Sequence, residues 1–237
     1  MVEKAQAADE AEQEEGGVSV PEELSRRQDR LQVIRDAKKR LEGRVSPEKL
    51  TEKSQENFTD PDSRIMKVQG GFEQCYNTQV AVDSESQVIV AAEVTQDAND
   101  KRQLVPLVRK VEKETGELPK EIAADSGYCS EQNLENLDNL KVRGYISCAR
   151  EGKRANIDKE KFPATGKMAC RLKRKRGKQK YAKRKGMVEP VFGWVKSVLG
   201  FRQFLLRGLR AVSAEWRLVC AALNLRRLSG RIKWAPG

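Results

Sequence analysis

The stretch Glu121-Ile-Ala-Ala-Asp-Ser-Gly-Tyr128 decides the fold that this sequence predicts. It predicts a short strand over residues 121–125 that ends in a carboxylate and is followed by a tight turn into a helix. Open α/β sheets bind ligands at the carboxyl ends of their strands, which is where this prediction puts Asp125. Asp is also an ordinary turn residue. Position alone therefore does not decide whether Asp125 is a ligand-binding residue or an ordinary turn residue.

Strands and helices alternate on both sides of this stretch. The spacing of apolar and β-branched residues predicts the order strand, strand, helix, strand, helix, strand, over residues 79–82, 87–94, 101–114, 121–125, 130–139 and 143–147. This order predicts an α/β fold with a mixed sheet flanked by helices. Two further helices are predicted over residues 183–199 and 209–228.

The remaining segments differ in composition from this α/β region. Residues 21–43 predict a charged helix with a narrow apolar stripe, which fits a coiled-coil arm or a helix laid on a larger body. The other segments are an acidic disordered start, a loop, a basic flexible insertion and a tail, over residues 1–20, 44–73, 149–182 and 231–237. The predicted α/β domain covers residues 74–230.

Charge is distributed unevenly along the chain. Residues 141–237 contain 27 Lys and Arg against 5 Asp and Glu, whereas residues 1–140 contain 19 against 30. A basic half of this density is typical of a protein that binds a polyanion, and nucleic acid is the commonest one. A solvated basic tail remains the alternative. Only 5% of residues are aromatic, which argues against base stacking and so against an RNA-binding protein.

The absence of histidine restricts the chemistry most. It excludes Ser-His-Asp and Cys-His catalysis and His-ligated zinc. Any hydrolytic site must then consist of carboxylates, which favour Mg²⁺ or Mn²⁺. The five cysteines are scattered and form no Cys-x-x-Cys pair, so we expect reduced thiols. The chain has an acidic start and no apolar run of about 18 residues, so we expect a cytoplasmic protein without a membrane span.

Glu189 is the second candidate carboxylate. It lies next to Val188 and Pro190 in a helix with an apolar face, where a charge costs free energy unless it is paired or bound to a metal. Pro190 also suggests that the helix begins here, and the helix dipole favours Glu at such a position. Lys196 follows two turns later on the same face, so the pair could present a metal ligand and a phosphate contact.

Three segments together resemble DDE-type insertion-sequence transposases. Ile122-Ala-Ala-Asp-Ser-Gly-Tyr128 resembles the segment around their second catalytic Asp, and Val188-Glu-Pro-Val-Phe-Gly-Trp-Val-Lys196 resembles the segment around their catalytic Glu. Asp60-Pro-Asp-Ser-Arg64 and the run from Gly71 to Asp83 are similar to the segment before the sheet hairpin in one large subgroup. The resemblance runs from about residue 21 to residue 228.

This resemblance implies a ribonuclease H-like catalytic domain that holds two Mg²⁺ or Mn²⁺ ions and cuts and joins DNA at element ends and targets. Asp125 would be the second metal-binding carboxylate and Glu189 the third. Lys196 matches a family lysine that contacts DNA, and Arg184 or Lys185 matches a basic residue before the Glu. Further DNA contacts are expected from the basic run Lys173, Arg174, Lys175 and Arg176.

The resemblance fails at the family's first catalytic Asp, because no segment of this sequence matches the strand that carries it. Asp83 and Asp97 lie on or after later strands and are poor replacements. We therefore expect a carboxy-terminal portion that lacks the central first strand and has two unpaired sheet edges. It would work with an upstream transposase fragment or by self-association. The alternative is a catalytically inactive transposase remnant that only binds DNA.

Overall fold

The structure is a computed structural model and describes residues 22–46, 48, 50–51, 54–68, 70–148 and 158–230. The chain divides into two compact units, Met1–Pro61 and Asp62–Gly237. The predictions for residues 1–20 and 231–237 lie outside the described residues, as does the part of the predicted insertion over residues 149–157.

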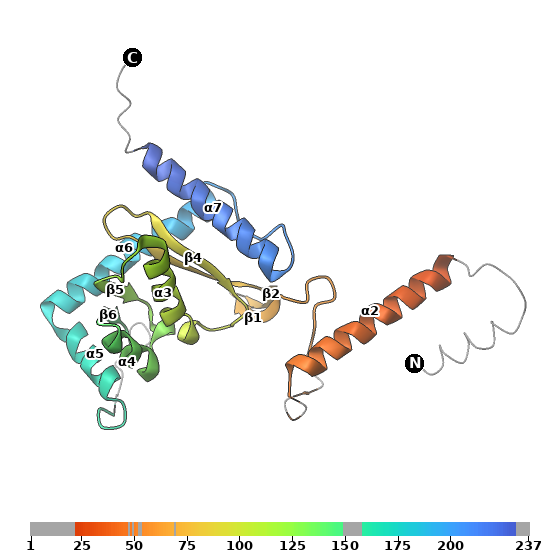
Figure 1. Cartoon of the computed structure of the whole chain (residues 1–237), viewed down its shortest axis with the longest axis horizontal. Helices are drawn as coiled ribbons and strands as arrows, with labels where there is room; N and C mark the ends of the chain where they lie inside the picture. Colours follow the sequence, from red (N-terminus) through yellow and green to blue (C-terminus); the bar gives the residue numbers. More distant parts are fainter. Residues whose placement is uncertain are drawn as a thin grey trace, which may run out of the picture. The chain divides into compact units, whose positions relative to one another are not determined.

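The first unit contains helix α2, Glu22–Arg44, which confirms the charged helix predicted over residues 21–43 (Figure 1). Its one described buried apolar residue is Ala37, and Val33 and Ile34 are exposed. The guanidinium groups of Arg40 and Arg44 both reach the carboxylate of Glu56, at 2.9 and 3.1 Å. Because the Glu56 side chain is buried between them, these ion pairs hold the segment after the helix against its last turns.

The second unit opens with a hairpin of strands β1, Arg64–Val68, and β2, Gly71–Cys75. The loop predicted over residues 44–73 is therefore wrong at its end. The Ser, Asp and Pro residues that indicated a loop lie before residue 64, whereas residues 64–68, Arg-Ile-Met-Lys-Val, contain two β-branched residues, which favour a strand. Gly70 has a φ of 102°, which supplies the left-handed residue that the turn between the strands needs.

The next ladder pairs β3, Asn77–Val82, with β4, Ile89–Thr95, in antiparallel order, which confirms the predicted hairpin. Helices α3, Leu104–Thr115, and α7, Leu209–Ser229, cover its two faces (Figure 1). On the α3 side, Ala91 packs with Leu107 and Val111. On the α7 side, β4 packs against an apolar cluster that includes Val212, Trp216, Cys220 and Leu223.

The third ladder pairs β5, Glu121–Ala124, with β6, Arg143–Ile146, in parallel. The intervening helix α4, Glu131–Asn139, confirms the predicted strand-helix-strand unit. Helices α5, Pro163–Lys173, and α6, Lys175–Ser197, follow. The core around β6 includes Leu134 and Leu137 of α4, Ala164 and Met168 of α5, and Leu104 and Val108 of α3. Helix α3 therefore belongs to the cores of both the β3–β4 and β5–β6 ladders.

The mixed α/β architecture agrees with the sequence prediction, but one continuous mixed sheet does not form. Within the described part of the chain, the strands make three separate ladders, β1–β2, β3–β4 and β5–β6. A ladder needs two backbone edges within about 5 Å of each other. Between the start of β3 and the turn after β5, side chains make the link instead, since the Tyr128 hydroxyl donates to Gln79 Oε1.

The flexible insertion predicted over residues 149–182 is wrong where the structure describes it, because this part contains α5 and the first turns of α6. The predicted helix start near residue 183 is also wrong, because α6 begins at Lys175. Lys and Arg are good helix formers, so a basic composition does not by itself indicate a loop. A Cβ on Gly177 would lie 2.0 Å from the carbonyl oxygen of Arg171, so the sharp turn between α5 and α6 requires glycine there.

Candidate functional site

Asp125 lies at the carboxyl end of β5, as predicted, and is half-buried. Its Oδ1 accepts a hydrogen bond of 2.9 Å from the Gly127 N–H and so caps the short helix η3, Ser126–Tyr128. The two interpretations of Asp125 are thus compatible. The residue fixes its own turn through one carboxylate oxygen, and it occupies the strand end where α/β folds bind ligands.

A second carboxylate, Asp100, lies near Asp125 at the end of β5. The sequence did not predict it. It opens the short helix η2, Asp100–Arg102. A Cβ built on Gly127 would lie 2.9 Å from Asp100 Oδ2 and 3.1 Å from Asp125 Oδ1. The carboxylates of Asp100 and Asp125 therefore both lie where a side chain at residue 127 would begin, and a larger residue would have to displace one of them.

Amide side chains from β3 hold Asp100 in place. Its Oδ1 accepts hydrogen bonds of 2.8 Å from Asn77 Nδ2 and 2.7 Å from Gln79 Nε2. Gln79 is only 2% exposed and also donates to Asn77 Oδ1 at 2.9 Å. A sequence signal for this group existed, because Asn77 and Gln79 lie on one face of a strand that ends Val-Ala-Val, and a buried amide needs hydrogen-bond partners. That signal does not identify Asp100 as the partner.

Tyr128 closes the cluster from the other side. Burial, and then the carboxylates of Asp100 and Asp125, raise the pKa of its hydroxyl. The hydroxyl therefore stays protonated and acts as a hydrogen-bond donor to Gln79 Oε1. Behind it, Asn133 Nδ2 donates to the carbonyl oxygens of Lys101, at 2.6 Å, and Tyr128, at 2.8 Å. We call Asn77, Gln79, Asp100 and Tyr128 the corner network.

Cys129 follows Tyr128 at the end of η3, and Cys148 lies two residues after the end of β6. All five cysteines of the chain are free. A hydrogen bond from the Cys148 thiol lowers the pKa of Cys129, whereas this contact and burial raise the pKa of Cys148. The Cys148 thiol therefore keeps its proton, and the Cys129 thiol ionises more readily.

Glu189 lies in a different environment from Asp125. It is exposed on α6, on the same face as Gly186, Gly193 and Lys196. A Cβ added at either glycine would meet no atom within 4 Å, so this face is open. The argument that Glu189 is a costly charge on an apolar face is wrong, because the apolar side of α6 is formed by other residues, including the buried Val191 and Val195.

Pro190 lies inside α6 and does not begin it, which corrects the second argument about Glu189. Proline has no N–H to donate to the carbonyl oxygen four residues earlier, that of Gly186. This oxygen accepts a hydrogen bond of 3.2 Å from Gln87 Nε2 instead. Gln87 in turn accepts two hydrogen bonds from Arg227 Nη1, so the turn before β4 joins α6 to α7.

The predicted basic residues lie in several places. Lys196 is exposed on the Glu189 face, and Arg184 stacks over the ring of Tyr181 at 5.4 Å. Lys173, Arg174, Lys175 and Arg176 are exposed at the junction of α5 and α6. Arg176 and Lys180 pair with Glu121 at 3.0 and 2.6 Å, and the hydrogen bond from Lys180 lowers the pKa of that carboxyl. Glu121 begins β5, so this cluster lies at the opposite end of the strand from Asp125.

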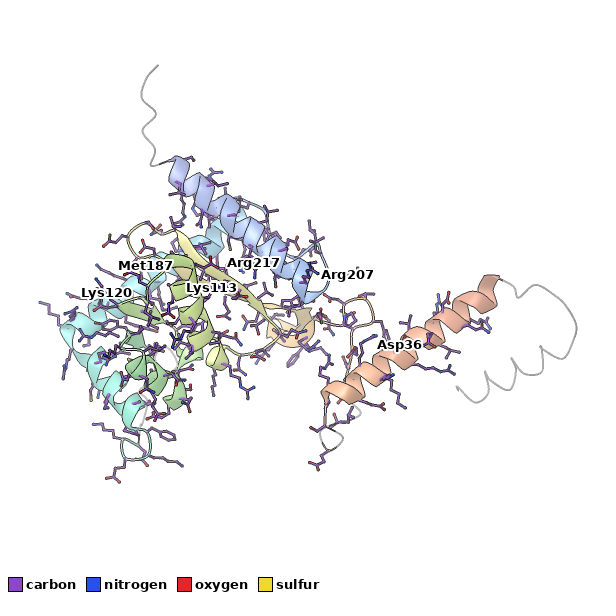
Figure 2. All side chains as sticks on the ribbon, in the orientation of Figure 1. Asp36, Lys113, Lys120, Met187, Arg207 and Arg217 are labelled. Carbon is purple, nitrogen blue, oxygen red and sulfur yellow. The ribbon has the colours of Figure 1, made fainter. Side chains whose placement is uncertain are left out.

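A surface pocket lies at the outer edge of β4, where α3 and α7 approach each other. Its lining includes Lys113 and Arg217, which are labelled in Figure 2. The Lys110 ammonium pairs with Glu93, and Arg217 lies 3.9 Å from the same carboxylate. The Asn224 side chain exchanges two hydrogen bonds of 2.8 Å with the backbone of Ile89 and so covers part of this strand edge.

No group of three or more His, Cys, Asp or Glu side chains that could hold a metal ion forms among the residues that the structure describes. Asp125 lies near Asp100. In the described part of the chain, no hydrogen bond or ion pair joins Glu189 to either of these carboxylates. The binding of one ion by Asp125 and Glu189 therefore stays a prediction. Among the described helices, none is long and apolar enough to cross a membrane.

Comparison with known proteins gives one family. A family model described as a transposase DDE domain matches residues 22–225. This match covers most of the chain and includes Asp125 and Glu189. Searches of curated proteins and of solved structures gave no match.

Proposed function

The chain belongs to the family of transposase DDE domains, and we propose that it acts in DNA transposition, by metal-dependent cleavage and joining of phosphodiester bonds at insertion-sequence ends. In this proposal Asp125 and Glu189 are the metal-binding carboxylates and DNA is the partner. The observation that carries the proposal is the placement of Asp125 at the carboxyl end of β5, where α/β folds bind ligands.

The proposed ion is Mg²⁺ or Mn²⁺, and the side chains fit it in kind. Both ions prefer oxygen ligands. Asp125 presents a carboxylate at the carboxyl end of β5, and Glu189 lies on an open helix face. They do not fit it in number, because residues 22–46, 48, 50–51, 54–68, 70–148 and 158–230 contain no cluster of three such ligands. We propose that a further oxygen ligand comes from outside the described residues.

The open face of α6 supports DNA contact near Glu189. Gly186 and Gly193 leave space on both sides of the carboxylate, so a polymer backbone can approach it closely. Lys196 lies two turns further along the same face, about 10 Å along the helix axis, and can neutralise a phosphate there. We propose Arg184 and Lys185 as additional phosphate contacts, since they precede Glu189 on the same helix. The exposed basic run over residues 173–176 would bind DNA at a separate point.

We also propose a ribonuclease H-like arrangement, with a strand position between β3 and β5. Two observations support this proposal. No ladder joins β3 to β5 among the described strands. All four residues of β5 are only partly buried, although three of them are apolar. A strand that paired with both edges would complete one mixed sheet. Its source would be an upstream transposase fragment or a second copy of the chain.

The alternative is a DNA-binding protein of the same family that is catalytically inactive. The lack of a three-ligand cluster in the described residues favours this alternative for the chain acting alone. The basic carboxy-terminal half would still bind DNA without sequence preference, and the binding would weaken as salt rises.

A nicking and strand-transfer assay in Mn²⁺ separates the two functions. The chain is tested alone and mixed with a fragment that contains the upstream strand, and each is compared with Asp125→Asn, Glu189→Gln and the control Asp138→Asn. Asp138 is an exposed carboxylate on α4, away from both candidate ligands. We expect activity in the mixture that both site variants abolish and the control retains.

Activity that survives in Asp125→Asn and Glu189→Gln would refute the assignment of these carboxylates. No activity in either preparation, together with DNA binding that weakens as salt is added, would establish the inactive DNA-binding alternative.

A further inference from the structure

We propose that the corner network of Asn77, Gln79, Asp100 and Tyr128 positions Asp125, with Asp100 as its central member. The inference rests on the proposed function for the role of Asp125. It assigns Asp100 as a positioning residue that acts through the turn at Gly127, rather than as a third ligand of the ion. Three features of the corner support this assignment.

The first feature is that side chains carry the link between two ladders. Backbone hydrogen bonds join β3 to β4 and β5 to β6, but none of the described ladders joins β3 to β5. Gln79 of β3 uses its whole amide group in the network. Its Nε2 donates to Asp100 and Asn77, and its Oε1 accepts from Tyr128, three residues after Asp125. The placement of the Asp125 turn relative to β3 therefore depends on this amide.

The second feature is the close approach at Gly127. Asp100 Oδ2 and Asp125 Oδ1 lie 2.9 and 3.1 Å from the position that a Cβ on Gly127 would take, so the two carboxylates share the space beside this residue. Asp100 cannot move away freely, because two amide groups hold its other oxygen at 2.7 and 2.8 Å. Asp125 is tied to the same turn through the Gly127 N–H. We therefore expect a shift of Asp100 to change the space that the Asp125 turn occupies.

The third feature is a pair of hydrogen bonds from the Asn133 side chain to the main chain. Asn133 is 5% exposed, and its Nδ2 joins the carbonyl oxygens of Lys101 and Tyr128. The Asn133 side chain therefore connects the backbone at Lys101, next to Asp100, with the backbone at Tyr128, three residues after Asp125. The two segments are thus joined at their side chains and at their main chains, so the corner behaves as one rigid piece.

Amide hydrogen exchange in the full chain tests the inference without reference to activity. We compare wild type with Asp100→Ala, Asp100→Asn and the control Asp97→Ala. Asp97 lies in the same loop and accepts a hydrogen bond of 2.7 Å from Gln103, but it does not border Gly127. In Asp100→Ala we expect exchange in residues 125–129 to rise by about 10-fold or more, with α7 unchanged, because the opening is local. The Asp97→Ala control should leave residues 125–129 as in wild type.

The Asn variant separates positioning from metal binding. Its side-chain oxygen can still accept from Asn77 and Gln79, so Asp100→Asn should keep residues 125–129 protected. If the strand-transfer assay shows activity, Asp100→Ala should lower kcat by roughly 100-fold with little change in KM, as expected for a small misplacement of a reacting group. Asp100→Asn should retain most of the activity.

Unchanged exchange at residues 125–129 in Asp100→Ala would overturn the inference, whether or not the chain is active. Equal loss of activity in Asp100→Asn and Asp100→Ala, with the turn still protected in the Asn variant, would also overturn it and make Asp100 a ligand. If the turn loosens in Asp100→Ala while wild type does not cut DNA, the positioning of Asp125 is supported and only the proposed reaction fails.

Discussion

The two candidate carboxylates lie in environments that differ in almost every respect. Asp125 is half-buried, caps its own turn and borders a network that reaches β3 and η2. Glu189 is exposed on an open face of α6, between two glycines whose Cβ positions are empty. Both belong to segments that resemble the same family. One carboxylate is therefore preorganised by its own chain, and the other is accessible to whatever binds on the α6 face.

This difference shows that a family motif does not by itself fix how a residue is held. The Asp125 segment carries its own constraints, because the turn, the glycine and the following tyrosine all contribute contacts. The Glu189 segment constrains the opposite side of its helix, where Val191 and Val195 pack into the core. Perturbations of the two regions should therefore differ in size and even in sign.

The largest effect is expected from Gln79→Leu, which removes the amide from the corner network. Leucine fills a similar volume but leaves the Tyr128 hydroxyl without its acceptor and Asp100 without one donor. We expect a loss of about 3 kcal/mol in the free energy of unfolding, because buried polar groups would lose their partners. Urea unfolding measures it. The matched control is Gln179→Leu, at an exposed position of α6, which should change stability by less than about 0.5 kcal/mol.

The second prediction makes the same substitution in both regions. Gly127→Ala places a Cβ against Asp100 Oδ2 and Asp125 Oδ1, and we expect a loss of about 1–3 kcal/mol from overpacking. Gly193→Ala meets no atom within 4 Å and should gain about 0.5–1 kcal/mol from the higher helix propensity of alanine. Thermal unfolding of both variants gives the two signs. If both substitutions stabilise the protein, Gly127 is not confined as described.

The smallest effect concerns the carboxylates themselves. Asp125→Ala removes the cap of η3, and we expect a loss of about 1 kcal/mol. Glu189→Ala removes an exposed side chain from α6 and should stay within about 0.5 kcal/mol of wild type. Denaturant unfolding of both variants at neutral pH compares them. Equal losses would contradict the contrast between a constrained and an open carboxylate.

The sequence predicted well those elements that local patterns specify. The hairpin of β3 and β4, the helices α3 and α4 and the parallel strands β5 and β6 all lie where spacing of apolar residues placed them. Asp125 was placed correctly because a strand end and a Ser-Gly turn are both local features. The predictions are wrong at β1, β2, α5 and the start of α6, because Ser, Pro and basic residues indicate loops by composition although they also occur in these strands and helices.

The candidate site was predicted less completely, because its contacts join distant parts of the chain. Asp100 is 23 residues from Asn77, and Tyr128 is 49 residues from Gln79. No local pattern distinguishes Asp100 from the neighbouring Asp97, although only Asp100 borders Gly127. The sequence does not predict the exposure of Glu189 either. Pro190 indicates a helix start by local rules, whereas Gln87, 99 residues from Gly186, satisfies the Gly186 carbonyl oxygen that this proline leaves without a donor.

The sequence by itself determined that Asp125 ends a strand, that Gly127 follows in a tight turn and that histidine takes no part in any site. These properties depend on residue identity and on neighbours within a few positions. The tertiary structure alone decided that Asp100 meets Asp125 and that Glu189 faces open space. The physical reason is the packing of α3, which contributes side chains to the cores of both ladders and so brings the start of β3 to the end of β5.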